Sequence, residues 1–434
     1  MSTETIGVIA LVVMLGLMLF RVPIVISIAL PGVVGILYLK DWTVLRNAVD
    51  SIIWNHSLSY TMSTIPMFMW MGEMLTASGI SSELYNSFRL WLGRLKGGLA
   101  MATIGASAVF AAASGSSVAN TGTIGMMASR EMLKFKYSKP LASGSIVAGG
   151  TLGILIPPSG FLIIYGMLTE QSIGKLLLAG IIPGIILSLL FVITIFVSVL
   201  IKPDLAPPAE KASWKERFVS IKSTIWILIL FVIVIGGMFF GFFGPTEAAG
   251  IGALAATLLA LAKGKLTWKV FWETLRRTTL SSGFLFAIIL AAFLFNYFLT
   301  ISKVPTMLSS LLTDAGYPPL VTFIMIVIMY VILGAVMDSM AALVVTIPIV
   351  MPIIESLGHD LIWFGIVMCL LVEVALISPP HGMNIMVLNG VVPEYGLGNI
   401  FIGALLFVIP IFFMVALLYI FPDIVLFLPD RMMG

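Results

Sequence analysis

Long apolar segments alternate with short polar ones along nearly the whole chain. A helix that crosses the hydrocarbon core of a bilayer needs about 20 mainly apolar residues. Ten segments reach or approach this length: 5–20, 22–39, 60–79, 140–168, 176–201, 225–241, 246–262, 279–300, 361–390 and 400–427. The pattern predicts an all-α polytopic membrane protein with a lipid bilayer as its surroundings.

Two further apolar segments, 98–129 and 318–357, are too long for one span and carry a polar, small-residue patch in the middle. This pattern predicts two re-entrant helical hairpins, which enter the membrane and return to the same side. Segments near 41–58 and 265–278 are predicted to lie at the membrane interface, which tryptophan favours. The tryptophans of these two segments are Trp42, Trp54, Trp268 and Trp272.

Composition narrows the class of protein. Of 434 residues, 60% are hydrophobic and only 10% are charged, too few to cover the surface of a water-soluble globule. The formal net charge is +3 and the basic residues are scattered among separate loops, so no nucleic-acid partner is expected. The single cysteine, Cys369, lies in an apolar segment, which excludes an intrachain disulfide and a thiolate metal cluster. We expect Cys369 to pack in the core or against lipid.

The distribution of positive charge predicts the orientation. If the N-terminus lies outside, 18 of the 23 Lys and Arg residues fall in cytoplasmic loops, as the positive-inside rule requires. The polar segment 202–222 is then a cytoplasmic linker near the middle of the chain, and both termini are outside. The N-terminal sequence MSTET has Glu4 but no basic residue, unlike a cleaved signal peptide, so we expect it to be retained.

The two halves of the chain resemble each other at an offset of 222 residues. The offset places Pro157 and Pro158 on Pro379 and Pro380, and it also superposes Pro23 on Pro245, Ser117 on Ser339, Ala119 on Ala341, Gly160 on Gly382 and Ile163 on Ile385. These identities predict two repeats, 1–201 and 223–434. Because the first repeat contains five complete spans, an odd number, the second enters the membrane with opposite polarity. The result is an inverted repeat, which is common in secondary transporters.

Four polar segments interrupt the predicted membrane helices: 114–121, 149–160, 338–341 and 378–384. Proline removes backbone donors and glycine relaxes the backbone, so carbonyl groups lose their intrahelical partners. In hydrocarbon such groups require protein, water or an ion. The new helix N-terminus beside each break favours a carboxylate. Each break therefore predicts a cation site next to an anion site, although proline kinks and small packing residues are also common in membrane helices without any ligand.

Few ionisable residues lie within the predicted spans. Asp338, at the tip of the second hairpin, costs about 2.5–3.5 kcal/mol at membrane depth and is expected to be functional, with a packing hydrogen bond as the alternative. Glu373 and Glu247 are weaker candidates, since either can be a structural cap. The histidines are scattered, and no paired carboxylates or zinc motif occur, so the sequence predicts a protein that is not an enzyme.

Several longer motifs resemble the large membrane subunits of tripartite ATP-independent periplasmic (TRAP) transporters. They are IPMFMWMGEMLTASGIS at 65–81, SGSSVANTGTIG at 114–125, GGTLGILIPPSGFLIIYG at 149–166 and GPTEAAGIGAL at 244–254. The resemblance implies import of small organic anions coupled to sodium ions across the bacterial inner membrane, where the distribution of charge predicts that both termini are periplasmic. It implies an elevator mechanism, in which a transport domain of both hairpins and the broken helices 140–168 and 361–390 moves against a scaffold. It also implies two partners, a small four-helix membrane subunit and a periplasmic substrate-binding protein.

The resemblance assigns site residues as well. One sodium ion would be held by Ser114, Ser117 and the carbonyl groups around Gly150, Gly153 and Pro157. A second would be held by Gly334, Asp338 and the carbonyl groups before Pro379. The substrate would face Ser116, Asn120, Ser159, Ser339 and His381.

One position departs from part of this family. Sialic-acid members usually have Asp where this chain has Asn120, so sialic acid is not the expected substrate. A stand-alone sodium/dicarboxylate symporter of similar hairpin architecture remains the alternative, because the sequence does not show whether a binding protein delivers the substrate. His381, beside paired prolines, can equally be a structural hydrogen-bonding residue.

Overall fold

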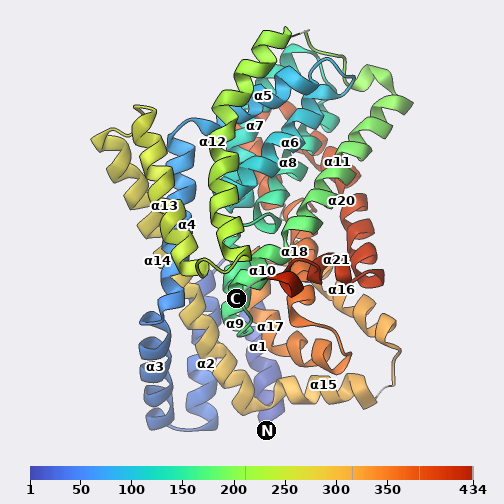
Figure 1. Ribbon diagram of the computed structural model, residues 1–434. Helices are drawn as coiled ribbons and strands as arrows, with labels where there is room; N and C mark the ends of the chain where they lie inside the picture. The colour runs from blue at the N-terminus through green and yellow to red at the C-terminus, as the bar shows by residue number, and fades with distance from the viewer. Residues whose placement is uncertain (211, 315, 381, 433–434) are drawn as a thin grey trace.

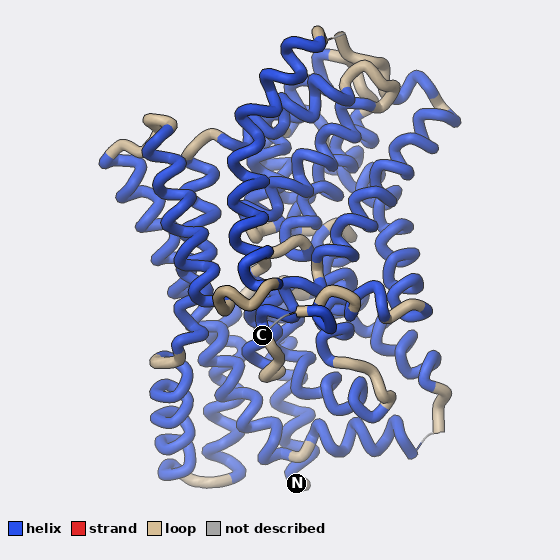
Figure 2. The backbone as a smooth tube through the Cα atoms, in the orientation of Figure 1, coloured by secondary structure: helices blue, strands red, loops and turns tan. Residues whose placement is uncertain are grey.

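In the computed structural model the protein consists of helices joined by turns, and the described residues, 1–210, 212–314, 316–380 and 382–432, contain no strand (Figure 1 and Figure 2). In this part of the chain five helices are long and apolar enough to cross a membrane, or up to seven if each of two bent pairs counts as one span. Five further apolar helices have 10–17 residues. The all-α prediction is confirmed, while the count of ten spans stays a prediction.

The N-terminal part contains α1 (Thr3–Leu19), α2 (Ile24–Leu39), α3 (Trp42–Ser57), the 3-10 turn η1 (Tyr60–Ser63), α4 (Thr64–Ala77) and α5 (Ile80–Leu92). Side-chain caps begin two of these helices. Ser2 Oγ accepts a hydrogen bond from Thr5 N at 3.2 Å, and Asp41 Oδ1 accepts one from Val44 N at 2.9 Å. α3 fills the segment predicted to lie at the interface, whereas α5 falls where no helix is predicted.

Two interrupted helix pairs follow. The first pair is α6 (Gly98–Ser114) and α7 (Ser117–Lys134), and the second is α8 (Lys139–Leu155) and α9 (Gly160–Leu168). α8 and α9 differ in direction by 40°. Both interruptions lie within polar segments that the sequence marks as breaks. α10 (Ile173–Ala179), α11 (Ile181–Ile201) and the 3-10 turn η2 (Pro203–Leu205) end the first half.

The second part of the predicted linker 202–222 is helical, because α12 (Trp214–Phe239) begins inside it. A capping box starts this helix: Ser213 Oγ accepts from Glu216 N at 3.2 Å, and Glu216 Oε2 accepts from Ser213 N at 2.7 Å. The assignment of 202–222 as the linker between the two repeats stays a prediction.

No break separates the predicted interfacial segment 265–278 from the predicted span 279–300. After α13 (Pro245–Ala262), a single helix of 35 residues, α14 (Trp268–Ser302), covers both segments. Thr267 Oγ1 caps this helix by accepting from Val270 N at 3.3 Å. No proline follows before its end to stop it.

The second half also contains two interrupted pairs. α16 (Pro319–Val336) and α17 (Ser339–Ser356) occupy the second predicted hairpin, and α18 (Leu361–Leu376) and α19 (Met383–Val391) occupy the predicted broken span. The remaining elements are α15 (Val304–Asp314), η3 (Pro393–Tyr395), α20 (Leu397–Ile420), α21 (Asp423–Leu426) and η4 (Pro429–Arg431).

Two helices carry the most deeply buried part of the molecule. Every residue of α18 except its first is buried, and so is every residue of α8 from Leu141 onward. α8 packs against α6, α7, α11 and α20, and it also contacts α18 and α19. A second group of contacts joins α4 to α13 and α14, and α2 to α1 and α14. Figure 1 shows α1, α2, α3 and α15 at one end of the molecule and α5 to α8 toward the other.

Candidate functional site

The turn between α6 and α7 is only two residues long. Gly115 ends α6 with φ +57°, a conformation that glycine adopts without steric cost. Ser116 then caps α7, since its Oγ accepts a hydrogen bond from Ala119 N at 3.3 Å. Ser114 Oγ donates to the carbonyl oxygen of Ser116 at 3.4 Å. The tip of this hairpin therefore brings hydroxyl groups and a helix N-terminus to one place.

The break between α8 and α9 follows from two adjacent prolines, Pro157 and Pro158, which are joined by a cis peptide bond. Neither has a backbone N–H. The carbonyl groups of Gly153 and Ile154 therefore have no donor four residues ahead in the helix. The break falls in the C-terminal part of the predicted segment 149–160, because α8 continues through its glycines to Leu155. The prolines end the helix and the glycines do not.

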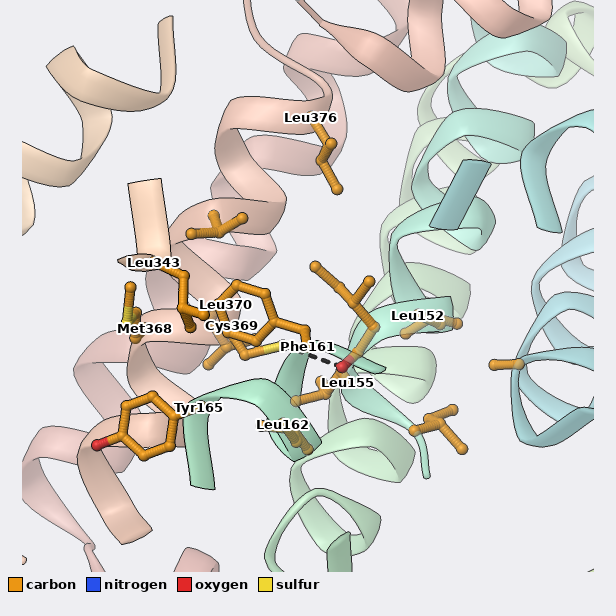
Figure 3. Packing of buried hydrophobic residues seen from close by; sticks show 14 of the residues in the cluster. Leu152, Leu155, Phe161, Leu162, Tyr165, Leu343, Met368, Cys369, Leu370 and Leu376 are labelled. Carbon is orange, nitrogen blue, oxygen red and sulfur yellow. Dashed lines mark hydrogen bonds between the residues drawn. The ribbon is translucent and has the colours of Figure 1, made fainter. Parts of the chain in front are cut away.

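Side chains replace the lost donors at Ile154. Its carbonyl oxygen accepts from Ser159 Oγ at 2.5 Å. It also accepts from Cys369 Sγ, on α18, at 3.2 Å, the bond drawn as a dashed line in Figure 3. Ser159 also caps α9, since Leu162 N donates to its Oγ at 3.3 Å. In the described part of the chain no side chain donates in the same way to the carbonyl group of Gly153.

The hairpin tip and the helix break touch through their backbones. A Cβ atom on Gly153 would lie 2.6 Å from the carbonyl oxygen of Ser116 and 2.8 Å from Ser117 N. A Cβ atom on Gly115 would lie 2.5 Å from the carbonyl oxygen of Pro158. Both separations are too short for any larger residue. Only glycine at these two positions allows the tip of α6 and α7 to rest on the end of α8.

Asn120 joins three helices beneath this contact. The side chain is fully buried, and its Nδ2 donates to the carbonyl oxygens of Ser107 on α6, at 3.0 Å, and of Gly149 on α8, at 3.3 Å. Next to it, the Thr121 hydroxyl lies against Gly150 of α8. The structure thus places Asn120 in the packing of the first hairpin against α8.

Asn384 connects the second half of the chain to the same region. It lies fully buried in the first turn of α19, and its Nδ2 donates to Ser117 Oγ at 2.7 Å and to the carbonyl oxygen of Val147 at 3.4 Å. No role was assigned to Asn384 from the sequence. The only sequence feature that could have indicated a role for Asn384 is its position at the end of the polar segment 378–384.

Several buried polar atoms near Asn120 and Asn384 have no hydrogen-bond partner in the described structure. Four buried oxygen atoms have no hydrogen-bond partner in the described structure: Ser107 Oγ, Asn120 Oδ1, Thr121 Oγ1 and Asn384 Oδ1. Buried polar groups are normally paired with protein or ordered water, so a group of four is unusual. The region between α6, α7, α8 and α19 is therefore rich in neutral oxygen ligands.

The predicted residues of the second half lie at the two other breaks. Asp338 caps α17 through Oδ1, which accepts from Met340 N at 2.7 Å, and Ser339 is the first residue of that helix. Gly334 is buried where α16 packs against Ala375 of α18. Pro379 is exposed in the turn after α18. His381 lies outside the described residues.

The structure brings the first set of predicted residues together. Ser116 and Ser117 contact Gly153 directly, and Ser114 joins them through its hydrogen bond to the carbonyl oxygen of Ser116. Ser159 lies in the turn of the same helix break. Gly334 and Asp338 lie together at the second hairpin. Asn384 provides the hydrogen bond between the halves.

The site where the tip of α6 and α7 contacts the end of α8 suits a monovalent cation better than a transition metal. The described residues contain no group of three or more His, Cys, Asp or Glu side chains that could hold a metal ion. The available ligands are hydroxyl groups and a carbonyl group that lacks its helical donor. Such neutral oxygen atoms fit a sodium ion, and the N-termini of α7 and α9 favour an anion nearby.

Comparison with known proteins decides the family. The sequence profile described as "Tripartite ATP-independent periplasmic transporter, DctM component" matches residues 11–424. The chain belongs to this family. The resemblance of its motifs to TRAP large subunits is thereby confirmed, and the chain is a transporter permease rather than an enzyme.

Two curated TRAP relatives show how far the similarity extends. The C4-dicarboxylate TRAP transporter large permease of Pseudomonas aeruginosa is 34% identical over 84% of this chain and 85% of its own length. The sialic acid TRAP transporter large permease of Vibrio cholerae is 31% identical over 87% of this chain and 88% of its own length. The solved YdaH transporter of Alcanivorax borkumensis has a similar fold, with a TM-score of 0.60 at 15% identity over 88% of this chain and 89% of its own.

Replacing Asn384 with alanine is expected to destabilise this TRAP permease. The change removes both interhelical hydrogen bonds of the amide, and losing buried hydrogen bonds of this kind costs about 1–3 kcal/mol. Thermal unfolding in detergent measures the loss. The matched control is Asn55→Ala, because Asn55 makes only an exposed hydrogen bond to Ser51 within α3. Equal stability of the two variants would contradict a connecting role for Asn384.

Proposed function

We propose that this TRAP permease is the translocating subunit of a sodium-coupled importer of small organic carboxylates. The observation that carries the proposal is the backbone contact between the tip of α6 and α7 and the end of α8. At this contact Gly153, whose carbonyl group lacks a helical donor, lies beside Ser116 and Ser117, and the N-termini of α7 and α9 are close to each other. These are the ligands that a sodium ion and a carboxylate require.

The sodium ion would be held by residues of this contact. Ser114 and Ser117 supply hydroxyl oxygens, and the carbonyl groups around Gly150, Gly153 and Pro157 supply the others. When bound, the ion offsets negative charge on the substrate in a site of low dielectric constant. A second ion would lie at the corresponding place in the other half, near Gly334, Asp338 and Pro379.

The substrate would bind at the helix N-termini beside the first ion. Ser116 and Ser159 cap α7 and α9, so a carboxylate at these ends meets backbone N–H groups and hydroxyls together. Ser339 is the first residue of α17, which Asp338 caps, and Asn120 and His381 complete the predicted set. The names of the relatives, which include C4-dicarboxylate and sialic acid permeases, support an organic anion as substrate. Asn120 argues against sialic acid.

The mechanism would be an elevator within an inverted repeat. Both halves contain a two-helix hairpin followed by a helix that breaks at paired prolines 222 positions apart. The transport domain would comprise these hairpins and broken helices, and the remaining helices would brace it. The distribution of basic residues supports periplasmic termini in the inner membrane.

The partners would be a small four-helix membrane subunit and a periplasmic substrate-binding protein. Reconstitution in proteoliposomes tests this requirement together with sodium coupling. We expect uptake of a C4-dicarboxylate only with an inward sodium gradient and all three components. Uptake of free substrate by the permease alone would instead support the stand-alone symporter, and uptake that ignores sodium would refute the proposal.

Ser117→Ala is expected to raise the sodium concentration needed for half-maximal uptake by about tenfold. This factor corresponds to ~1.4 kcal/mol, the free energy expected for the loss of one ligand. Sodium titration of uptake measures the shift. Ser129→Ala is the control, since Ser129 lies on the same helix, three turns away, and bonds only to the carbonyl oxygen of Met126. If both variants retain the wild-type sodium dependence, Ser117 is not a ligand.

A further inference from the structure

Glu373 is the one acidic residue in the interior of α18, and the proposed transport function does not use it. Its side chain is 0% exposed. Neither carboxyl oxygen has a hydrogen-bond partner in the described structure. The protein itself covers the Glu373 side chain, so this burial does not depend on the surrounding lipid.

The titratable groups of the neighbouring helices either form hydrogen bonds with residues other than Glu373 or lie near helix ends. On α9, Tyr165 donates to the carbonyl oxygen of Leu361 at 2.6 Å, and on α16 Tyr330 pairs with Thr346 at 2.6 Å. Cys369, one turn before Glu373 on α18, donates to the carbonyl oxygen of Ile154. The other titratable residues on the helices that pack against α18 are Lys139, Lys175, Asp338, Glu355, Tyr419 and Asp423.

These surroundings restrict the state of the carboxyl group. An ionised carboxylate without partners, removed from water, costs far more than a folded protein tolerates, and such groups become neutral instead. A metal cation would need several further oxygen ligands, yet neither oxygen has a hydrogen-bond partner among the described residues. A proton needs none.

We propose that Glu373 is a proton-binding site, and that its carboxyl group carries a proton while α18 is buried as in this structure. The proton is released when a rearrangement admits water to α18, because hydration stabilises the carboxylate. Any conformational step that exposes α18 to water therefore has an equilibrium that depends on the proton concentration on the side from which the water enters. The proposal is independent of the sodium sites and would stand if they were wrong.

Infrared difference spectroscopy of the purified permease at neutral pH tests the proposal. We expect the spectrum of the wild type minus that of Glu373→Gln to contain the carbonyl band of a protonated carboxylic acid, shifted downward in heavy water. Bands of an ionised carboxylate alone would overturn the proposal. Glu355→Gln is the matched control, because it makes the same change of side chain at an exposed position of α17.

A second variant covers failure of Glu373→Gln to fold. Glu373→Asp retains an acid, so its difference spectrum against the wild type should show a displaced protonated-acid band, whereas carboxylate bands alone would again overturn the proposal. Sodium-dependent anion binding, measured on the same samples, separates this result from any failure of sodium coupling.

Discussion

Replacing Gly153 with valine is expected to abolish uptake. Even the first carbon of the new side chain would lie 2.6 Å from the carbonyl oxygen of Ser116, which belongs to a backbone that cannot rotate away. The hairpin tip must then leave the end of α8, and overpacking of this kind costs about 1–3 kcal/mol or more. Uptake in proteoliposomes measures the effect, and thermal unfolding of the same protein reports whether the fold survives.

Gly250→Val is the control for this change, because a Cβ atom on Gly250, in α13, meets nothing within 4 Å. Gly153→Ala provides a milder variant if valine prevents insertion into the membrane. Undiminished uptake by a folded Gly153 variant would show that the contact between the tip and α8 is not needed for transport.

Asp338→Asn is expected to raise the sodium concentration needed for half-maximal uptake by at least about tenfold, which corresponds to ~1.4 kcal/mol. Asparagine caps helices about as well as aspartate, so α17 should keep its N-terminal hydrogen bond to Met340 N. What the variant loses is the negative charge that a buried cation would need. Membrane insertion should be unchanged.

Asp360→Asn separates charge from capping. Asp360 caps α18 by accepting from Ile362 N at 2.6 Å and Trp363 N at 3.2 Å, so it repeats the structural role of Asp338 at another helix. We expect the Asp360→Asn variant to need the same sodium concentration for half-maximal uptake as the wild type. Wild-type rates in Asp338→Asn at limiting sodium would remove Asp338 from the cation site.

The breaks after α8 and α18 were predictable because their cause is local. Paired prolines lack the N–H groups that a helix needs, and this holds in any surroundings. Glycine is different, since it permits a break without requiring one. The glycines of α8 are held in helical form by close packing against Ser107, Thr121 and the tip of the hairpin, which are contacts that the sequence does not reveal.

Helix ends and polar contacts between distant segments were harder to predict. Hydropathy placed a boundary inside α14 that the backbone does not have, because a change from polar to apolar residues does not by itself end a helix. α5 and α15 mix polar and apolar residues over 13 and 11 positions, too short and too polar to mark as spans. The bond between Asn384 and Ser117 joins residues 267 positions apart, so only the fold could show it.

Anion binding measured across a sodium titration tests the central claim most directly. If sodium and substrate stabilise the same arrangement of the hairpin tip and α8, each must raise the affinity of the other by the same factor. The complex is titrated with a C4-dicarboxylate at increasing sodium, with potassium holding the ionic strength constant. The account predicts that anion affinity rises with sodium, whereas an affinity independent of sodium would contradict it.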